Sequence, residues 1–199
     1  MTTAPHQIAA LLGSRICHDL ISPIGAISNG VELMQMSSDV SGPEVELISE
    51  SVENANARIR FFRIAFGVAS VDQMVGAKEI RDTLDDLTKG SRLSIDWQSH
   101  GDEARRDVKI LFLLIQCFEA AMPWGGQLTI ESTGANWVMS GTSDRMKIDP
   151  DLWATLENMN HGADIGAAEV QFLLLPVLLQ ETQRTLHVET SATGITVRL

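Results

Sequence analysis

The sequence predicts an α+β protein in which a long helical hairpin precedes an α/β layer. From about residue 8 to residue 68, apolar side chains recur at helical steps of three and four, with one turn-forming segment between two runs. After about residue 76, helical runs alternate with short strand-like runs. Hydrophobic residues make up 44% of the chain, which is enough for a packed core. The predicted architecture is therefore an N-terminal antiparallel helical hairpin followed by a C-terminal α/β sandwich.

The hairpin is predicted from two long amphipathic segments. The first helix covers about residues 8–36 and contains Pro23, where the missing backbone donor predicts a local kink. Residues 37–43 are rich in turn formers, and Pro43 suits the first turn of a second helix over about residues 44–68. The second helix repeats its apolar residues as a heptad seam. A short turn between two such helices makes them antiparallel neighbours.

A hairpin of two helices cannot cover all of its own apolar side chains. Leu11, Leu33 and Leu47, for example, lie outside the seam that the two helices share. A second copy of the chain would cover such residues in a four-helix bundle, and we therefore predict a homodimer. The alternative is that the C-terminal half of the same chain covers the hairpin.

The pattern changes near residues 70–75, which predicts a division into domains 1–72 and 73–199. The second domain is predicted to place helices on one face of a mixed sheet. Its helices are expected at about 78–89, 103–122, 151–158 and 167–182, and its strands at about 93–97, 127–132, 136–140, 145–148, 185–190 and 194–199.

Composition and charge exclude several classes of function. The chain has 26 acidic and 15 basic residues, a net charge of -11 and no basic run, so we expect no nucleic-acid partner. No apolar run is long enough for a membrane span, and we expect no membrane attachment. Cys17 and Cys117 are predicted to be buried free thiols, which suits a cytoplasmic protein. The five histidines lack metal-ligand spacing, so we expect no metal site and no cofactor of the chain's own.

The residues best suited to carry out chemistry are the adjacent pair His18 and Asp19. At about 100° per residue, His18 lies roughly opposite the seam of the first helix and should face solvent. An exposed imidazole is substantially neutral near physiological pH, so its free nitrogen can attack an electrophile. Asp19 could bind the other ring nitrogen or receive its proton.

Small residues share the side of the helix on which His18 lies. Glycine inside a helix costs about 1 kcal/mol relative to alanine, so two glycines here need a reason. A smooth track on which another protein docks would supply one. The residues of this small-residue track are Ser22, Gly25, Ala26, Asn29 and Gly30.

The stretch from His18 to Pro23 resembles the H-box of histidine kinase dimerisation domains, with Ile21 as the one departure from its pattern. The C-terminal half resembles a kinase ATPase domain in layout, and residues 111–130 are similar to its first nucleotide-binding helix and following strand. Leu113 and Cys117 stand where that helix would carry metal-binding asparagines, and neither offers an oxygen to a hard cation.

The other nucleotide-binding motifs of such a domain are also missing. Residues 141–144 do not supply the expected adenine-binding motif, and residues 162–166 are only a weak remnant of a phosphate lid. A histidine-bearing hairpin joined to a degenerate ATPase-like domain is similar to the histidine phosphotransferase ChpT family of phosphorelays. We therefore expect no ATP binding.

This resemblance implies a homodimer that accepts a phosphoryl group on His18 from the receiver domain of a hybrid kinase and passes it to response-regulator receivers. Asp19 would be its acid-base or orienting neighbour, and the receiver would bring its own aspartate and Mg²⁺. Ser22, Gly25, Ala26 and Asn29 would contact the receiver.

Two further sets of side chains in the sequence carry expectations. One set could offset the acidity of a docked receiver and consists of Arg58, Arg60 and Arg63. The other set is expected in the core and consists of Trp124, Trp137 and Trp153.

Two alternatives stay open from the sequence. One is an ATP-dependent histidine kinase with a divergent nucleotide site, and the other is a non-catalytic dimeric scaffold that binds receivers.

Overall fold

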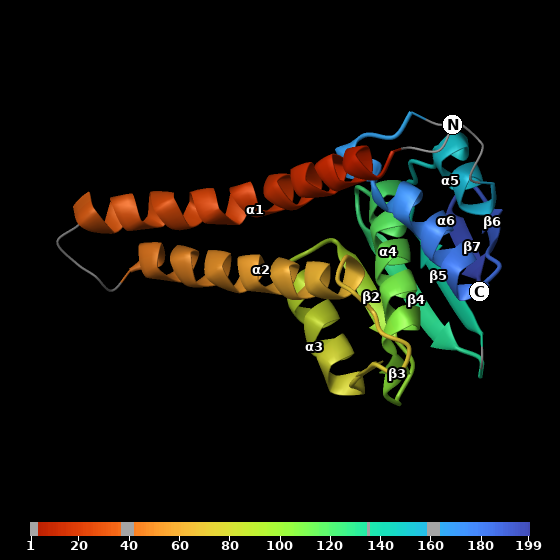
Figure 1. Ribbon diagram of the computed structural model, residues 1–199. Coiled ribbons are helices and arrows are strands. Elements are labelled where there is room, and N and C mark those ends of the chain that lie inside the picture. The colour runs from red at the N-terminus through yellow and green to blue at the C-terminus, as the bar shows by residue number, and fades with distance from the viewer. Residues whose placement is uncertain (1–3, 37–41, 135, 159–163) are drawn as a thin grey trace.

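The N-terminal third of the chain forms the predicted hairpin. The computed structural model describes residues 4–36, 42–134, 136–158 and 164–199, so most of the predicted turn at 37–43 lies outside the described residues. Helix α1 (Pro5–Met36) and helix α2 (Pro43–Ala65) lie side by side and project from the rest of the molecule (Figure 1). Proline occupies the first turn of α2, as predicted. Helix α1 continues through Pro23 without interruption.

The packing of the two helices depends on Gly30. This glycine is buried, and a Cβ added to it would lie 2.5 Å from Ile48 Cγ1 of α2. Real Cβ atoms do not approach that closely, so glycine permits the close contact between the helices. The expectation that Gly30 belongs to the exposed small-residue track is therefore wrong, because this position turns toward α2.

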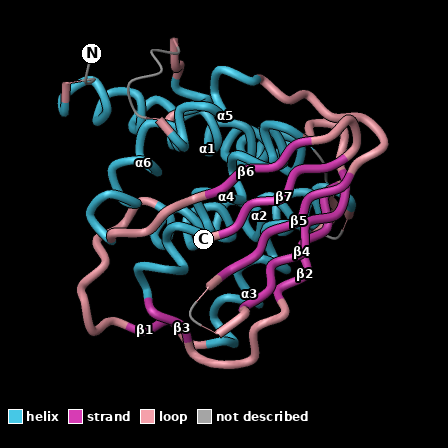
Figure 2. Tube along the Cα trace, turned by 90° about the vertical axis from the view of Figure 1, so that its right-hand side faces the viewer, coloured by secondary structure: helices cyan, strands magenta, loops and turns pink. Residues whose placement is uncertain are grey.

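The C-terminal part is a two-layer α/β structure, as predicted. Its main sheet has the order β2-β4-β5-β7-β6, in which β2 pairs parallel with β4 and every other pair is antiparallel. Figure 2 shows the helices gathered on one side of this sheet. The helices are α3 (Ala77–Thr88), α4 (Arg105–Ala121), α5 (Pro150–Glu157), the short 3₁₀ helix η1 (Ala167–Glu169) and α6 (Gln171–Thr182). The strands of the sheet are β2 (Leu93–Trp97), β4 (Gly126–Ser132), β5 (Trp137–Thr142), β6 (His187–Thr190) and β7 (Gly194–Arg198).

The sheet buries one face against the helices. In β4, Leu128 and Ile130 are fully buried while Gln127 and Glu131 are exposed, which is the alternation of a sheet covered on one side. Helix α4 lies at the centre of the core and is buried along almost its whole length. This explains why its sequence is nearly continuously apolar.

Two details of the strands differ from the predictions. Residues 145–148 do not form a strand, because both edges of β5 are already occupied by β4 and β7, and the Lys147 amide instead bonds to the Ala121 carbonyl at the end of α4. The structure also contains a two-stranded ladder of β1 (Met74–Val75) and β3 (Glu103–Ala104). The sequence predicts no strand there, because two residues are too short to show an alternation.

The hairpin is joined firmly to the C-terminal layer at the end of α2. Phe61 stacks on Phe112 of α4 with ring centroids 4.8 Å apart, and both side chains are fully buried. Arg105 donates to the Arg63 carbonyl at 2.7 Å, and Lys109 donates to the Gly67 carbonyl at 2.8 Å. Arg105 thus satisfies a carbonyl in the last turn of α2 and Lys109 one just after the helix ends, where positive charge complements the helix dipole.

Candidate functional site

His18 is presented to solvent, as its position on the helix predicts. Its side chain is 87% exposed, and its Nδ1 lies 3.1 Å from Oδ1 of Asp19. An ionised carboxylate has no proton to donate and can only accept a hydrogen bond, so Nδ1 carries the proton and donates it to Asp19. In the neutral ring, the other nitrogen, Nε2, is then the unprotonated one. The imidazole therefore offers a nucleophilic lone pair on its exposed side.

Asp19 is largely buried, in contrast to its neighbour. Its side chain is only 10% exposed, and its Oδ2 accepts from Nε of Arg15 at 2.8 Å. Nη1 of Arg58 lies 3.8 Å from the same oxygen, while Nε of Arg58 donates to the Asn54 side chain at 3.0 Å. Two guanidinium groups thus face one carboxylate oxygen, and the other oxygen faces His18.

Pro23 adds a backbone feature to the same place. It is buried inside α1 and has no N–H to donate to the carbonyl of Asp19, four residues earlier. The helix is therefore missing one rung of its hydrogen-bond ladder beside the His18–Asp19 pair.

Four of the five residues in the small-residue track accompany His18. Ser22, Gly25 and Asn29 are exposed and Ala26 is half-buried, whereas Gly30 is buried against α2. A Cβ added to Gly25 would meet no atom within 4 Å, so nothing in the chain itself requires glycine there. The surface beside the histidine is consequently smooth and open.

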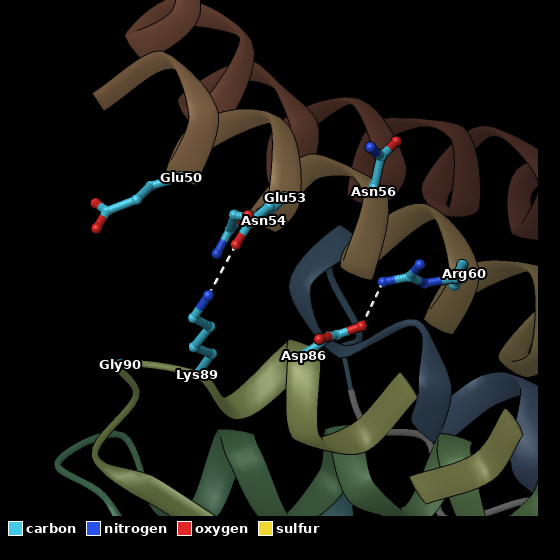
Figure 3. Close-up of a pocket in the computed structure, with 8 residues that line it drawn as sticks. All are labelled: Glu50, Glu53, Asn54, Asn56, Arg60, Asp86, Lys89 and Gly90. Carbon is cyan, nitrogen blue, oxygen red and sulfur yellow. Dashed lines mark hydrogen bonds and ion pairs between the residues drawn. The ribbon is translucent and has the colours of Figure 1, made fainter. Parts of the chain in front are cut away.

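The arginines of α2 are engaged by carboxylates of their own chain. Arg60 pairs with Asp86, and Nη2 of Arg63 lies 2.8 Å from Glu79, both partners being on α3. Figure 3 shows Arg60 and Asp86 facing each other in the crevice between α2 and the end of α3. Arg60 and Arg63 are therefore ion-paired with α3, and Arg58 is the one of the three that faces Asp19 beside His18.

Two expectations about exposure are wrong. Cys17 is exposed, because it lies one helical turn before Ile21 on an outer side of α1 that α2 does not cover; Cys117 is fully buried, as predicted. Trp124 is 41% exposed, since it sits in the loop after α4 beneath the guanidinium of Arg145, which lies 3.8 Å from its ring centre.

The other tryptophan predictions hold. Trp137 and Trp153 are 3% and 4% exposed and belong to the core. Trp153 makes edge-on ring contacts with Phe118 and Phe172, which ties α5 to α4 and α6.

The positions that would hold a nucleotide's metal in a kinase are part of the core here. Leu113 and Cys117 are both 0% exposed, and burial raises the pKa of the Cys117 thiol well above its ordinary value. In the described residues, no three or more His, Cys, Asp or Glu side chains are placed together to hold a metal ion. Residues 162 and 163 of the weak lid remnant lie outside the described part of the chain.

No helix in the described part of the chain is long and apolar enough to cross a membrane.

The residue that the sequence analysis missed is Arg15. It stands four positions before Asp19 on the same helix, a spacing at which oppositely charged side chains meet. That spacing is visible in the sequence and could have identified it.

A hairpin that exposes a histidine beside a held carboxylate, joined to an α/β layer whose core fills the nucleotide-metal positions, defines a phosphotransfer protein rather than an ATP-dependent kinase. The chain belongs to the histidine phosphotransferase family, since the family described as "Histidine phosphotransferase C-terminal domain" matches residues 77–194. That match covers the α/β layer and not the part of the hairpin that carries His18.

Whole-chain relatives include the hairpin. The chain is 27% identical over 201 residues to the protein phosphotransferase ChpT of Brucella abortus (strain 2308), covering 98% of this chain and 96% of that relative. A solved structure of a bacterial phosphotransferase superposes with a TM-score of 0.81 at 27% identity, covering 100% of this chain and 98% of the other. The predicted family and the phosphotransferase activity are thereby confirmed.

Proposed function

We propose that this protein is a phosphorelay intermediate in which His18 carries the phosphoryl group. The donor is the aspartyl phosphate of a hybrid kinase's receiver domain, and the acceptor is the aspartate of a response-regulator receiver. The observation that carries the proposal is the exposed His18 whose Nδ1 is 3.1 Å from Asp19, which leaves Nε2 open to a partner. No nucleotide site is required, because each transfer runs between the histidine and an aspartate.

The transfer step requires little from this chain beyond an aligned nucleophile. The Nε2 lone pair of His18 attacks the phosphorus, and the bond from phosphorus to the donor aspartate's oxygen breaks, with its electron pair leaving on that carboxylate. His18 then carries the phosphoryl group on Nε2 and a proton on Nδ1, and Asp19 stabilises the positive charge of the ring. The return step to the second aspartate is the reverse. Phosphoryl transfer depends mainly on positioning and charge stabilisation, and the receiver brings the Mg²⁺ that supplies the latter.

The docking surface in this proposal is the small-residue track beside His18. Small side chains let another backbone approach the histidine closely, and the open space around Gly25 supports this use. The four residues proposed to contact the receiver are Ser22, Gly25, Ala26 and Asn29.

The partner on the remaining apolar surface of the hairpin is proposed to be a second copy of the chain. Apolar side chains that are 41% to 68% exposed follow α1 at steps of three and seven residues and α2 at steps of seven, a pattern typical of the interface in a helical bundle. The C-terminal layer of the same chain leaves them uncovered. They are Ile21, Ile24 and Val31 on α1 and Val45, Val52 and Ile59 on α2.

We also propose that the chain divides into two domains, residues 1–72 and 73–199, and that the protein is cytoplasmic. The exposed free thiol of Cys17 suits a reducing compartment, in which receiver domains also operate.

One experiment separates the proposal from its alternatives. The purified protein is mixed with labelled ATP alone, and separately with a hybrid kinase's receiver domain labelled on its aspartate. We expect label on the protein only in the second mixture, and none in a His18→Gln variant. His187→Gln, a change at another exposed histidine, is the matched control and should accept label normally. Label from ATP alone would indicate a kinase, and label in neither mixture would indicate a scaffold.

The dimer is tested by its mass in solution. Val52→Glu places a charge in the middle of the apolar stripe and should convert the dimer to monomers in sedimentation or light-scattering measurements. Val68→Glu changes an 86% exposed valine outside the hairpin and should leave the mass unchanged. A wild-type protein that is monomeric at micromolar concentration would contradict the proposal.

A further inference from the structure

Arg15 connects the site on α1 to the C-terminal layer. Its Nε donates to Oδ2 of Asp19, while its Nη1 donates to the carbonyl oxygen of Ala168, 153 residues later in the chain. Ala168 belongs to the 3₁₀ helix η1, which packs on α1. The Arg15 side chain is only 17% exposed. Its contact with Asp19 is partly buried, whereas its contact with the Ala168 carbonyl lies at the surface. A single guanidinium therefore bridges the two parts of the molecule directly beside His18.

We infer that Arg15 is a positioning residue for phosphotransfer: anchored on the Ala168 carbonyl, it holds Asp19 so that His18 keeps its proton on Nδ1 and presents Nε2 to the receiver. This inference rests on the proposed function of His18. It also assigns a role to the C-terminal layer that requires no nucleotide, because that layer supplies the anchor.

The geometry requires arginine rather than any cation. The guanidinium is planar and presents donors along different edges, so Nε and Nη1 can meet two acceptors at once in a fixed relation. A lysine has one compact ammonium group on a flexible stem. It could replace the charge near Asp19 but could not fix the carboxylate against the Ala168 carbonyl in the same orientation.

The orientation of the carboxylate decides which nitrogen of His18 is nucleophilic. Oδ2 of Asp19 is occupied by Arg15, and by the more distant Arg58, so Oδ1 is the oxygen that remains for Nδ1 of His18. If the carboxylate rotated away, the ring would lose its partner and the proton could settle on either nitrogen. A histidine protonated on Nε2 cannot attack through that atom.

The charged groups around Asp19 form one neighbourhood. Arg15 and Arg58 face it from the hairpin, and Glu119 approaches from α4. Burial raises the pKa of Glu119, the two arginines oppose that rise, and Asp19 adds to it. Arg15 and Arg58 therefore act on both carboxylates, which is a second reason why loss of Arg15 should affect Asp19.

The test compares Arg15→Gln and Arg15→Lys with wild type, using Arg60→Gln as the matched control. Arg60 also lies on the hairpin, but it pairs with Asp86 of α3 and makes no contact with Asp19. The first readout is the tautomer of His18 in the unphosphorylated protein, measured from ring ¹⁵N shifts and assigned by loss of the signal in His18→Gln. The second is kcat and KM for label transfer from a phosphorylated receiver.

We expect wild type and Arg60→Gln to show the Nδ1-protonated ring, and Arg15→Gln to show a mixture of tautomers. The kcat of Arg15→Gln should fall by roughly 10- to 100-fold, the scale of a misplaced reacting group, with KM unchanged because the docking track is intact. Arg15→Lys should not restore wild-type values. An unchanged tautomer and kcat in Arg15→Gln, or full restoration by lysine, would overturn the inference.

Failure of the proposed function would look different. If His18 is not the phosphoacceptor, either wild-type protein accepts no label or the His18→Gln variant accepts it as well, while the tautomer measurement still reports whether Arg15 orients the pair. If wild type accepts label and Arg15→Gln behaves identically in both readouts, the function stands and the positioning role of Arg15 is wrong.

Discussion

Substitution of Gly25 separates the stability of α1 from the docking of a partner. Gly25 lies inside α1 on the side of His18, and a Cβ added there would meet no atom within 4 Å. Gly25→Ala and Gly25→Leu therefore introduce side chains into open space in the isolated chain. Any loss of function they cause must come from outside the fold.

The effect on stability follows from helix propensity. Replacing an exposed mid-helix glycine by alanine or leucine should stabilise the protein by about 0.5–1 kcal/mol, because the unfolded chain loses less freedom on folding. For a chain of this size that corresponds to a rise in Tm of roughly 1–4 °C. Gly30→Ala provides the opposite control. Its Cβ would lie 2.5 Å from Ile48 Cγ1, and such overpacking should outweigh the helix-propensity gain and lower Tm.

The effect on docking follows from the size of the new side chain. A leucine at Gly25 would stand in the space that a receiver is proposed to occupy. Forcing extra carbon atoms into a close contact costs about 1–3 kcal/mol, so KM for the phosphorylated receiver should rise roughly 5- to 150-fold. The smaller Gly25→Ala should show a lesser rise.

The assay combines thermal unfolding with label transfer on the same samples. The expected pattern for Gly25→Leu is a higher Tm together with a higher KM and an unchanged His18 tautomer. A variant that is more stable and transfers phosphate with wild-type KM would refute the assignment of this face as the docking track. A lowered Tm would contradict the open space around Gly25.

Three further predictions concern the core and its titrating groups. Phe61→Ala removes the ring that stacks on Phe112 and should lower the free energy of unfolding by about 3–5 kcal/mol in urea titrations; a loss below about 1 kcal/mol would contradict a tight joint between hairpin and sheet. A thiol reagent at pH 8 should modify one cysteine per native chain, the exposed Cys17, and reach Cys117 only in denaturant, because burial raises the pKa of that thiol; rapid reaction of both would be inconsistent with the core. Burial raises the pKa of Glu119 above its ordinary value of 4.5. Below pH 4.5 the carboxyl is protonated whether the chain is folded or unfolded, so its titration does not affect stability. As the pH rises from there through the folded-state pKa, the buried group becomes a carboxylate and destabilises the fold. Glu119→Gln should therefore raise Tm at pH 8, and the gain should shrink as the pH falls toward 4.5; a gain that grows in acid would reverse this sign.

Several features of the fold and the site could be predicted from local patterns in the sequence. The two helices of the hairpin follow from apolar spacing and from Pro43, because helical hydrogen bonds join residues only four apart. The exposure of His18 and the presence of Asp19 at its side follow from the same periodicity. Leu113 and Cys117 exclude metal-binding asparagines by residue type alone. Each of these conclusions depends on neighbours in the sequence.

Tertiary structure decided what depends on distant segments. Gly25 and Gly30 are residues of the same type on the same helix. Gly25 faces open space and Gly30 faces Ile48, and only the position of α2 distinguishes them. The predicted strand at 145–148 does not form beside β5, the strand that precedes it in the chain, because β4 and β7 already pair with both edges of β5. The anchor of Arg15 on Ala168 spans most of the chain, and no periodicity reports a contact between residues that packing alone brings together.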